Sequence, residues 1–154
     1  MIDSHGIEAG SGQPMELRIR YPHMSPMDNQ VWNRYIRENP QAFTEVWYDV
    51  RVGTAMVIPR GGPDFLKVVA DGVSRKRIDV VGRLGGIYWI VEIKPLGMMK
   101  GLGQLITYRD LFIKEFGTKV VVQMLLLCRR MEVDLVSTAR DQGISVVALD
   151  GILY

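Results

Sequence analysis

Three charged residues, Asp79, Glu92 and Lys94, lie on either side of a short glycine turn in the middle of the chain. If Gly85 and Gly86 form a two-residue hairpin turn, whose positive φ angles glycine tolerates, the register places Asp79 opposite Glu92. Lys94 shares the face of Glu92, because side chains alternate between the two faces of a strand. Side chains directly across a strand pair are roughly 4.5–5.5 Å apart at Cβ. The sequence therefore predicts two carboxylates and one ammonium group on one small patch.

This set of side chains indicates metal-assisted hydrolysis. Two close carboxylates repel each other unless a positive charge neutralises them, and a hard divalent cation with oxygen ligands does so. Asp79 and Glu92 are the predicted ligands of Mg²⁺ or Mn²⁺, and the carbonyl of Ile93 is a further predicted ligand. Lys94 is placed to orient or deprotonate a water molecule, or to stabilise charge on a phosphate. The arrangement suits hydrolysis of a phosphodiester bond.

Apolar residues alternate with the charged ones, and we expect them to form a core on the opposite face: Ile78, Val80, Trp89, Val91 and Ile93. A Glu-x-Lys pattern on a strand also suits a solvated surface. The patch could also be an ionic contact with another protein subunit. Substitution of Asp79 would then alter assembly and leave metal affinity unchanged.

The surrounding pattern predicts one domain over residues 25–154, preceded by an extended arm at residues 1–24. Ser25 and Pro26 are typical of a helix start, and Pro40 favours its end at Asn39. The further elements that the pattern predicts are strands at 44–52, 77–83 and 87–94, a helix at 98–116, a strand at 120–128, a helix at 131–142 and a strand at 144–149. This order predicts an α/β fold with a mixed central sheet flanked by helices.

Composition limits the class of protein. A chain of 154 residues with 47% hydrophobic residues suits one globular domain, and its apolar runs are too short to span a bilayer. We expect a soluble cytoplasmic protein without a membrane segment or secretion signal, and the single cysteine, Cys128, excludes an internal disulfide. The net charge is only +2, but Arg75, Lys76 and Arg77 form a basic cluster that could contact phosphates. A solvated loop rich in Lys and Arg is the commoner explanation of such a cluster.

The central part of the chain resembles the PD-(D/E)XK nuclease superfamily. The resemblance lies in Ile78-Asp79, the hairpin turn and the run Val91-Glu92-Ile93-Lys94-Pro95. In the next predicted helix, Gln104 and Tyr108 lie one turn apart and resemble the QxxxY motif of the RecB-like branch. The resemblance implies a restriction-endonuclease-like αβββαβ core over about residues 26–128 and metal-dependent hydrolysis of DNA. The roles that it implies are catalysis by Asp79, Glu92, Lys94 and Gln104, and DNA contacts by Arg75, Lys76, Arg77 and Tyr108.

The chain departs from the superfamily pattern in several places. Ile78 stands where the superfamily usually has proline, and the literal Pro63-Asp64 pair lies in a glycine-rich segment without a matching register. The first helix often supplies another acid, for which Glu38 and Glu45 are the two candidates. The early histidine of many RecB-like members is not found in the predicted first helix.

A second interpretation keeps the fold and drops catalysis, since superfamily members exist that retained the sheet and lost cleavage. Small domains of this type are frequent in bacteriophage genomes, and some are structural parts of the particle. The chain would then be a virion component of the neck or tail region, or part of another large assembly. The polar, glycine-containing arm fits this idea, because we expect a second copy or a larger assembly to hold it. If the chain is an active nuclease, the sequence does not distinguish endonuclease from exonuclease action, or single-stranded from double-stranded DNA as the substrate.

Overall fold

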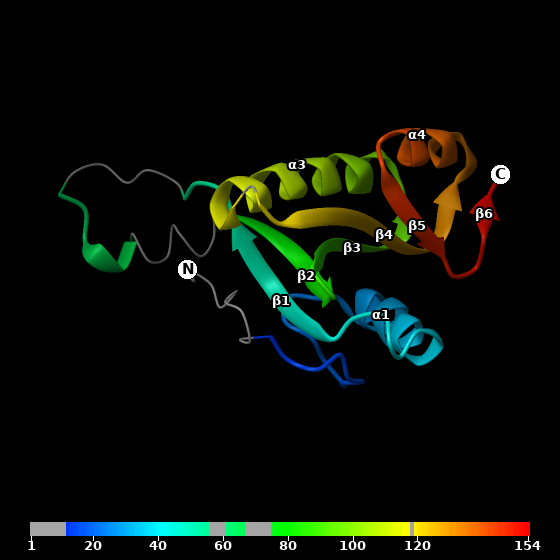
Figure 1. Cartoon of the computed structure of the whole chain (residues 1–154), viewed down its shortest axis with the longest axis horizontal. Helices are drawn as coiled ribbons and strands as arrows, with labels where there is room; N and C mark the ends of the chain where they lie inside the picture. Colours follow the sequence, from blue (N-terminus) through cyan, green and yellow to red (C-terminus); the bar gives the residue numbers. More distant parts are fainter. Residues whose placement is uncertain (1–11, 56–60, 67–74, 118) are drawn as a thin grey trace.

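One six-stranded mixed sheet runs through the chain, in the order β1-β2-β3-β4-β5 with β6 added to β4 (Figure 1). The structure is a computed structural model that describes residues 12–55, 61–66, 75–117 and 119–154. Strands β1, β2 and β3 are antiparallel, whereas β3, β4 and β5 are parallel. The elements are α1 (Pro26–Glu38), β1 (Glu45–Val52), β2 (Lys76–Leu84), β3 (Ile87–Gly97), α3 (Met99–Phe116), β4 (Val121–Glu132), the short 3₁₀ helix η1 (Val133–Leu135), α4 (Val136–Asp141), β5 (Ile144–Ala148) and β6 (Ile152–Leu153). The predicted α/β class with a mixed sheet and flanking helices is confirmed.

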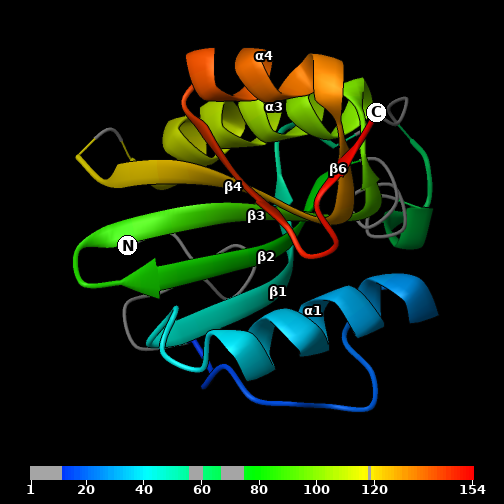
Figure 2. The ribbon, with the colours of Figure 1, turned by 90° about the vertical axis from the view of Figure 1, so that its right-hand side faces the viewer.

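Helices cover both faces of this sheet, α1 on one side and α3 with α4 on the other (Figure 2). The α1 side buries the residues that α1 contributes at helical spacing: Val31, Trp32, Tyr35 and Ile36. The α3 side buries the corresponding stripe of α3: Leu102, Leu105, Tyr108 and Phe112. Each helix therefore has one apolar stripe that it must bury against the sheet. No described helix is long and apolar enough to cross a membrane.

Helix α1 begins at a capping box. The Ser25 hydroxyl accepts from the backbone N–H of Asp28, and the Asp28 carboxylate accepts from the backbone N–H of Ser25. Pro26 at the first helical position adds to this start, because its fixed φ suits the helix. The helix ends at Glu38 with Asn39 as the C-cap residue, next to Pro40 as predicted. The capping box fixes Asp28 at the end of α1 that lies beside the carboxyl end of β3 (Figure 2).

Several predicted element boundaries after residue 94 were wrong. Strand β3 was expected to end at Lys94, before Pro95, but its pairing with β4 skips only Pro95 and continues to Gly97 opposite Met131. A Cβ on Gly97 would lie 2.5 Å from the Met131 sulfur, so this approach requires glycine. Strand β4 accordingly runs to Glu132, where a helix was predicted to begin, and α4 is short. Strand β6 was not predicted.

The predicted arm falls in part outside the described residues. Within the described part of the arm, Gln13 forms an antiparallel bridge with Val46 of β1. Its backbone N–H donates to the Val46 carbonyl at 3.0 Å, and its carbonyl accepts from the Val46 N–H at 2.8 Å. The arm therefore reaches the edge of the sheet at Gln13. Its proposed attachment to another copy or a larger assembly stays a prediction.

Candidate active site

Asp79 lies where the β2–β3 hairpin stops being a regular ladder. The hairpin has the predicted register, from Leu84 opposite Ile87 to Val80 opposite Val91, and one further step would pair Asp79 with Glu92. The backbone pairing ends before that step. Instead, the Asp79 Oδ2 atom accepts a hydrogen bond of 2.9 Å from the backbone N–H of Ile93. The carboxylate of Asp79 is thereby fixed against the segment that carries Glu92 and Lys94.

The same position is skipped on the other side of β2. The β1–β2 pairing is continuous except at Asp49 and Asp79, which face each other across the gap without pairing. Asp49 has a φ of +53°, in the left-handed region that non-glycine residues seldom adopt. Strand β2 therefore loses regular backbone pairing to both neighbours at Asp79.

The side chains of β2 also change from one face of the sheet to the other at Asp79. Val80 belongs to the core on the α1 side, whereas Ile78 belongs to the core on the α3 side. Residues two apart share a face in a regular strand, so this change of side marks a twist at the residue between them. The prediction that Ile78 shares the face of Val80, Val91 and Ile93 was wrong for this reason. The predicted packing of those three residues and of Trp89 in one core is confirmed.

Glu92 and Lys94 lie on the α3 side of β3 as an ion pair. Glu92 is buried, with 1% of its surface exposed, and its Oε1 atom lies 2.6 Å from the Lys94 ammonium, whose side chain is 30% exposed. Helix α3 comes close to this pair at Gly101. A Cβ on Gly101 would lie 3.1 Å from Leu126 and 3.8 Å from the Lys94 side chain. Glycine at this position keeps the side of α3 clear beside the lysine.

The two carboxyl groups hold protons more tightly than carboxyl groups in water. Burial, and then the charge of Asp79, raises the pKa of Glu92 to about 8. Burial raises the pKa of Asp79 to about 6, although the hydrogen bond from Ile93 opposes the rise. Burial lowers the pKa of Lys94, but the charges of Glu92 and Asp79 outweigh it, so the net shift is upward. Near neutral pH the coupled carboxyl pair therefore keeps about one proton, and Lys94 balances the remaining negative charge.

Helix α3 adds the Gln104 and Tyr108 side chains. The Gln104 Nε2 atom donates to the Tyr108 hydroxyl at 3.0 Å, as their spacing of one helical turn allows. Burial raises the pKa of Tyr108, and the charges of Glu92 and Asp79 add to the rise. The Tyr108 hydroxyl thus lies within electrostatic range of both carboxylates. The structure brings Asp79, Glu92 and Lys94 together, and it connects Gln104 to them through Tyr108.

Two buried oxygen atoms at this site have no hydrogen-bond donor among the described residues, Glu92 Oε2 and Gln104 Oε1. Buried acceptors are nearly always satisfied, so an orphaned carboxylate oxygen indicates a binding position for a cation or a donor. The described residues contain no group of three or more His, Cys, Asp or Glu side chains that could hold a metal. Mg²⁺, however, typically uses one or two carboxylates together with waters and phosphate oxygens. Asp79 and Glu92 fit that requirement, and the ligand role of the Ile93 carbonyl stays a prediction.

The structure favours a different acid from the first helix. Glu38 pairs with Arg34 at 2.9 Å at the far end of α1, and Glu45 pairs with Arg83. The charge of Asp28, in contrast, raises the pKa of both Asp79 and Glu92. The sequence did not predict Asp28, because its approach to the site depends on the packing of α1 beside the end of β3.

The predicted DNA-contacting cluster is mostly engaged within the protein. Arg75 donates to the Gly53 carbonyl at 2.8 Å and pairs with the Glu115 carboxylate, and its side chain is 8% exposed. Arg77 lies 2.7 Å from a ring nitrogen of His23 and 3.6 Å from the Asp49 carboxylate. Lys76 is exposed at the start of β2. These contacts connect β1 to α3 and to the arm, and the DNA-binding role of the cluster stays a prediction.

Comparisons of the chain with protein-family models, with curated proteins and with solved structures found no match. Only the residues and geometry of the site therefore indicate a function.

Proposed function

We propose that this chain is a divalent-metal-dependent nuclease of the PD-(D/E)XK type that hydrolyses phosphodiester bonds in DNA. The observation that carries the proposal is the interruption of β2 at Asp79. At this interruption the Asp79 carboxylate lies against the segment of β3 that carries the buried Glu92 and its partner Lys94. Sheets seldom bury a charged residue unless it is paired, so an unpaired carboxylate oxygen at such a place suits a ligand better than it suits packing.

Asp79 and Glu92 would hold Mg²⁺ or Mn²⁺, with the Ile93 carbonyl as the further predicted ligand. When bound, the cation would supply Lewis-acid stabilisation of the phosphate and an activated water. The upward pKa shift of Lys94 keeps its side chain protonated at neutral pH. Protonated lysine orients a water molecule and stabilises phosphate charge, and it does not abstract a proton. Gln104 would support the site through its unpaired amide oxygen, while Tyr108 fixes the orientation of its amide nitrogen.

Cleavage of supercoiled and linear DNA in the presence of Mg²⁺ or Mn²⁺ tests this proposal, with wild type compared to Lys94→Ala. We expect the variant to fold and its cleavage rate to fall by roughly 10²–10³-fold, the usual effect of removing one group that stabilises transition-state charge. Lys114→Ala is the matched control. Lys114 is an exposed lysine of α3, 2.6 Å from Asp110 and outside the site, so its removal should leave cleavage unchanged.

Two results would contradict the proposal. Equal cleavage by wild type and Lys94→Ala would assign the activity to a contaminating enzyme or to other residues. No cleavage by wild type with either metal would instead favour the catalytically silent, structural role in a phage particle or another large assembly. The partners of that assembly would then be the next question.

A further inference from the structure

A shallow hollow lies at the carboxyl end of β3, where Pro95 and Leu96 contribute to its lining. It is lined by three apolar residues, Met27, Pro95 and Leu96, and by the charged residues Arg129, Arg130 and Asp150. Its volume is about 340 Å³. Pro95 directly follows Lys94 in the chain, and Met27 directly precedes Asp28. The hollow therefore lies between the start of α1 and the ends of β3 and β4, and two of its lining residues are sequence neighbours of Lys94 and Asp28.

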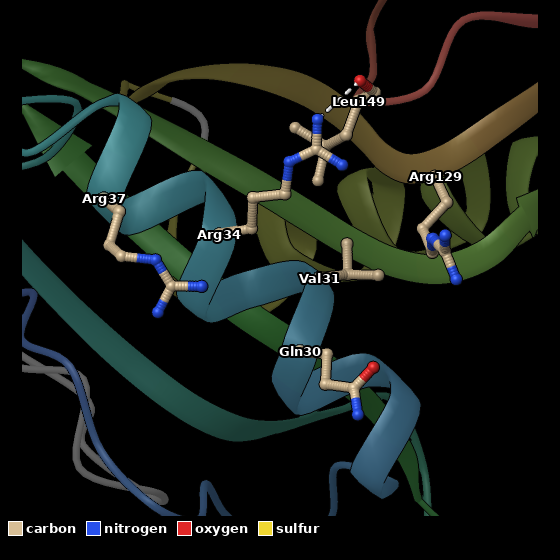
Figure 3. A pocket seen from close by; sticks show the side chains of 6 residues that line it. All are labelled: Gln30, Val31, Arg34, Arg37, Arg129 and Leu149. Carbon is tan, nitrogen blue, oxygen red and sulfur yellow. Dashed lines mark hydrogen bonds between the residues drawn. The ribbon is translucent and has the colours of Figure 1, made fainter.

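A second hollow, of about 310 Å³, lies against the middle of α1 (Figure 3). Arg34 and Arg37 of α1 and Arg129 of β4 lie around it, with Gln30, Val31 and Leu149 completing its lining (Figure 3). Arg129 lines both hollows. We call the two hollows together, with Arg34, Arg37, Arg129 and Arg130, the arginine groove.

The four arginines of the groove fall into two pairs. Arg34 and Arg129 converge on Asp150, at 2.6 Å and 2.9 Å from its two carboxylate oxygens. Arg34 also donates to the Leu149 carbonyl at 2.9 Å, so its guanidinium is held in place. Arg37 and Arg130 are exposed and form no ion pair with any described residue. The groove thus has two fixed guanidinium groups between two that remain available to a ligand.

We propose that the arginine groove binds the sugar–phosphate backbone of the DNA strand that leads into the active site. This inference rests on the proposed function, since it takes the phosphodiester cleaved near Lys94 as the end of the path. Exposed guanidinium groups suit phosphates, because each contact releases condensed counterions from the nucleic acid. The apolar lining residues Met27, Pro95 and Leu96 suit contact with a deoxyribose or a base of the bound strand. Arg75 and Arg77, which the sequence favoured for this role, are engaged by Glu115 and by His23 with Asp49.

The test measures DNA binding without cleavage, by fluorescence anisotropy of labelled single- and double-stranded oligonucleotides in EDTA over a series of KCl concentrations. The variant carries Arg37→Ala with Arg130→Ala. The control carries Lys119→Ala with Arg140→Ala, which removes the same charge from exposed positions elsewhere. We expect the first variant to bind at least about tenfold more weakly in low salt. Its salt-dependence slope should shrink by roughly 1.4 for single strands or 1.8 for duplex, as two lost phosphate contacts require. The control should bind like wild type.

An equal loss of DNA affinity in both double variants would show that only net charge matters, and it would overturn the proposal that the arginine groove binds DNA. Normal binding by the Arg37→Ala, Arg130→Ala variant, or no DNA binding by wild type, would also overturn it. A cleavage assay on the same proteins separates this inference from the proposed function. Wild type that binds through the groove but never cuts would support the groove and contradict the nuclease. Wild type that cuts, with the arginine variant binding normally, would contradict the groove alone.

Discussion

The turn half and the open end of the β2–β3 hairpin are built differently. In the turn half, residues 80–84 pair without interruption with residues 87–91, and the residues farthest from the turn are apolar and fully buried. At the open end, Asp79 leaves the ladder, Asp49 beside it takes a left-handed φ, and Glu92 is a buried charge. The same two strands therefore contain a regularly paired segment and an interruption, at which the Asp79 carboxylate contacts the backbone of β3.

This difference shows how the sheet tolerates an unfavourable cluster. Burying a carboxylate costs free energy unless it is fully paired, and here two carboxyl groups share one lysine. The turn half offsets that cost locally, because each fully buried valine or isoleucine stabilises the fold by about 1.5–3 kcal/mol. Four such residues lie there, namely Val80, Val81, Ile90 and Val91. The turn half should therefore determine stability, and the open end should determine function.

Ile90→Ala tests the turn half and has the largest expected effect on stability. Ile90 is fully buried between the sheet and α3, opposite Val81. Loss of its side chain should lower the free energy of unfolding by about 2–5 kcal/mol, through lost burial and a residual cavity. Urea denaturation measures this loss. The Mn²⁺ affinity of the folded variant should stay within about twofold of wild type, and a large loss of affinity would break the proposed division between the halves.

A change of pH acts on the open end. A carboxyl group whose pKa is raised by folding stabilises the fold fully below its unfolded pKa, near 4.5 for Glu92, and the stabilisation is lost as the pH rises through about 8. Asp79 acts in the same direction, with its pKa raised from 3.8 to about 6. The free energy of unfolding in EDTA should therefore fall by several kcal/mol, on the order of 5, between pH 5 and pH 8.

Urea denaturation at several pH values checks this trend, with Glu92→Gln as the comparison. The variant lacks the titrating group, so its stability should change much less over the same pH range. A wild-type stability that rises from pH 5 to pH 8, or an identical profile in the variant, would contradict the assignment of the titration to the open end.

Tyr108→Phe should have the smallest effect, because Tyr108 supports the open end through Gln104. The substitution removes the acceptor of the Gln104 amide hydrogen bond and keeps the buried ring. We expect a stability loss of about 1 kcal/mol, the usual net value of one hydrogen bond. Thermal denaturation measures it. The cleavage rate should fall by less than about tenfold, and complete loss of cleavage would instead give the hydroxyl itself a role in catalysis.

Much of this arrangement follows from the sequence by strand arithmetic. A two-residue Gly85-Gly86 turn determines the register, and the alternation of apolar residues identifies Val91 and Ile93 as core. The helical spacing of Gln104 and Tyr108 is equally local. These predictions succeed because each depends on residues that are neighbours in one element or across one turn.

The predictions that failed depend on contacts between distant elements. The exchange of sides at Asp79 requires Asp49 of β1 to adopt a left-handed conformation opposite it, and no local pattern indicates this. The continuation of β3 beyond Pro95 depends on the close approach of Met131 to Gly97. Asp28 approaches the site only because α1 packs with its first turn beside the end of β3. The arginine groove likewise joins α1 to β4, which lie far apart in the sequence.

The most direct test of the central claim is Mn²⁺ binding to wild type and to Asp79→Asn, measured by titration calorimetry at pH 8. Asparagine has nearly the shape of aspartate and retains an oxygen that can accept from the Ile93 N–H, so the variant should keep the fold. The account predicts that wild type binds Mn²⁺ and that the variant loses most of this affinity while its melting temperature in EDTA stays equal or rises. No binding by wild type, or equal binding by both proteins, would show that the interrupted hairpin does not form a metal site.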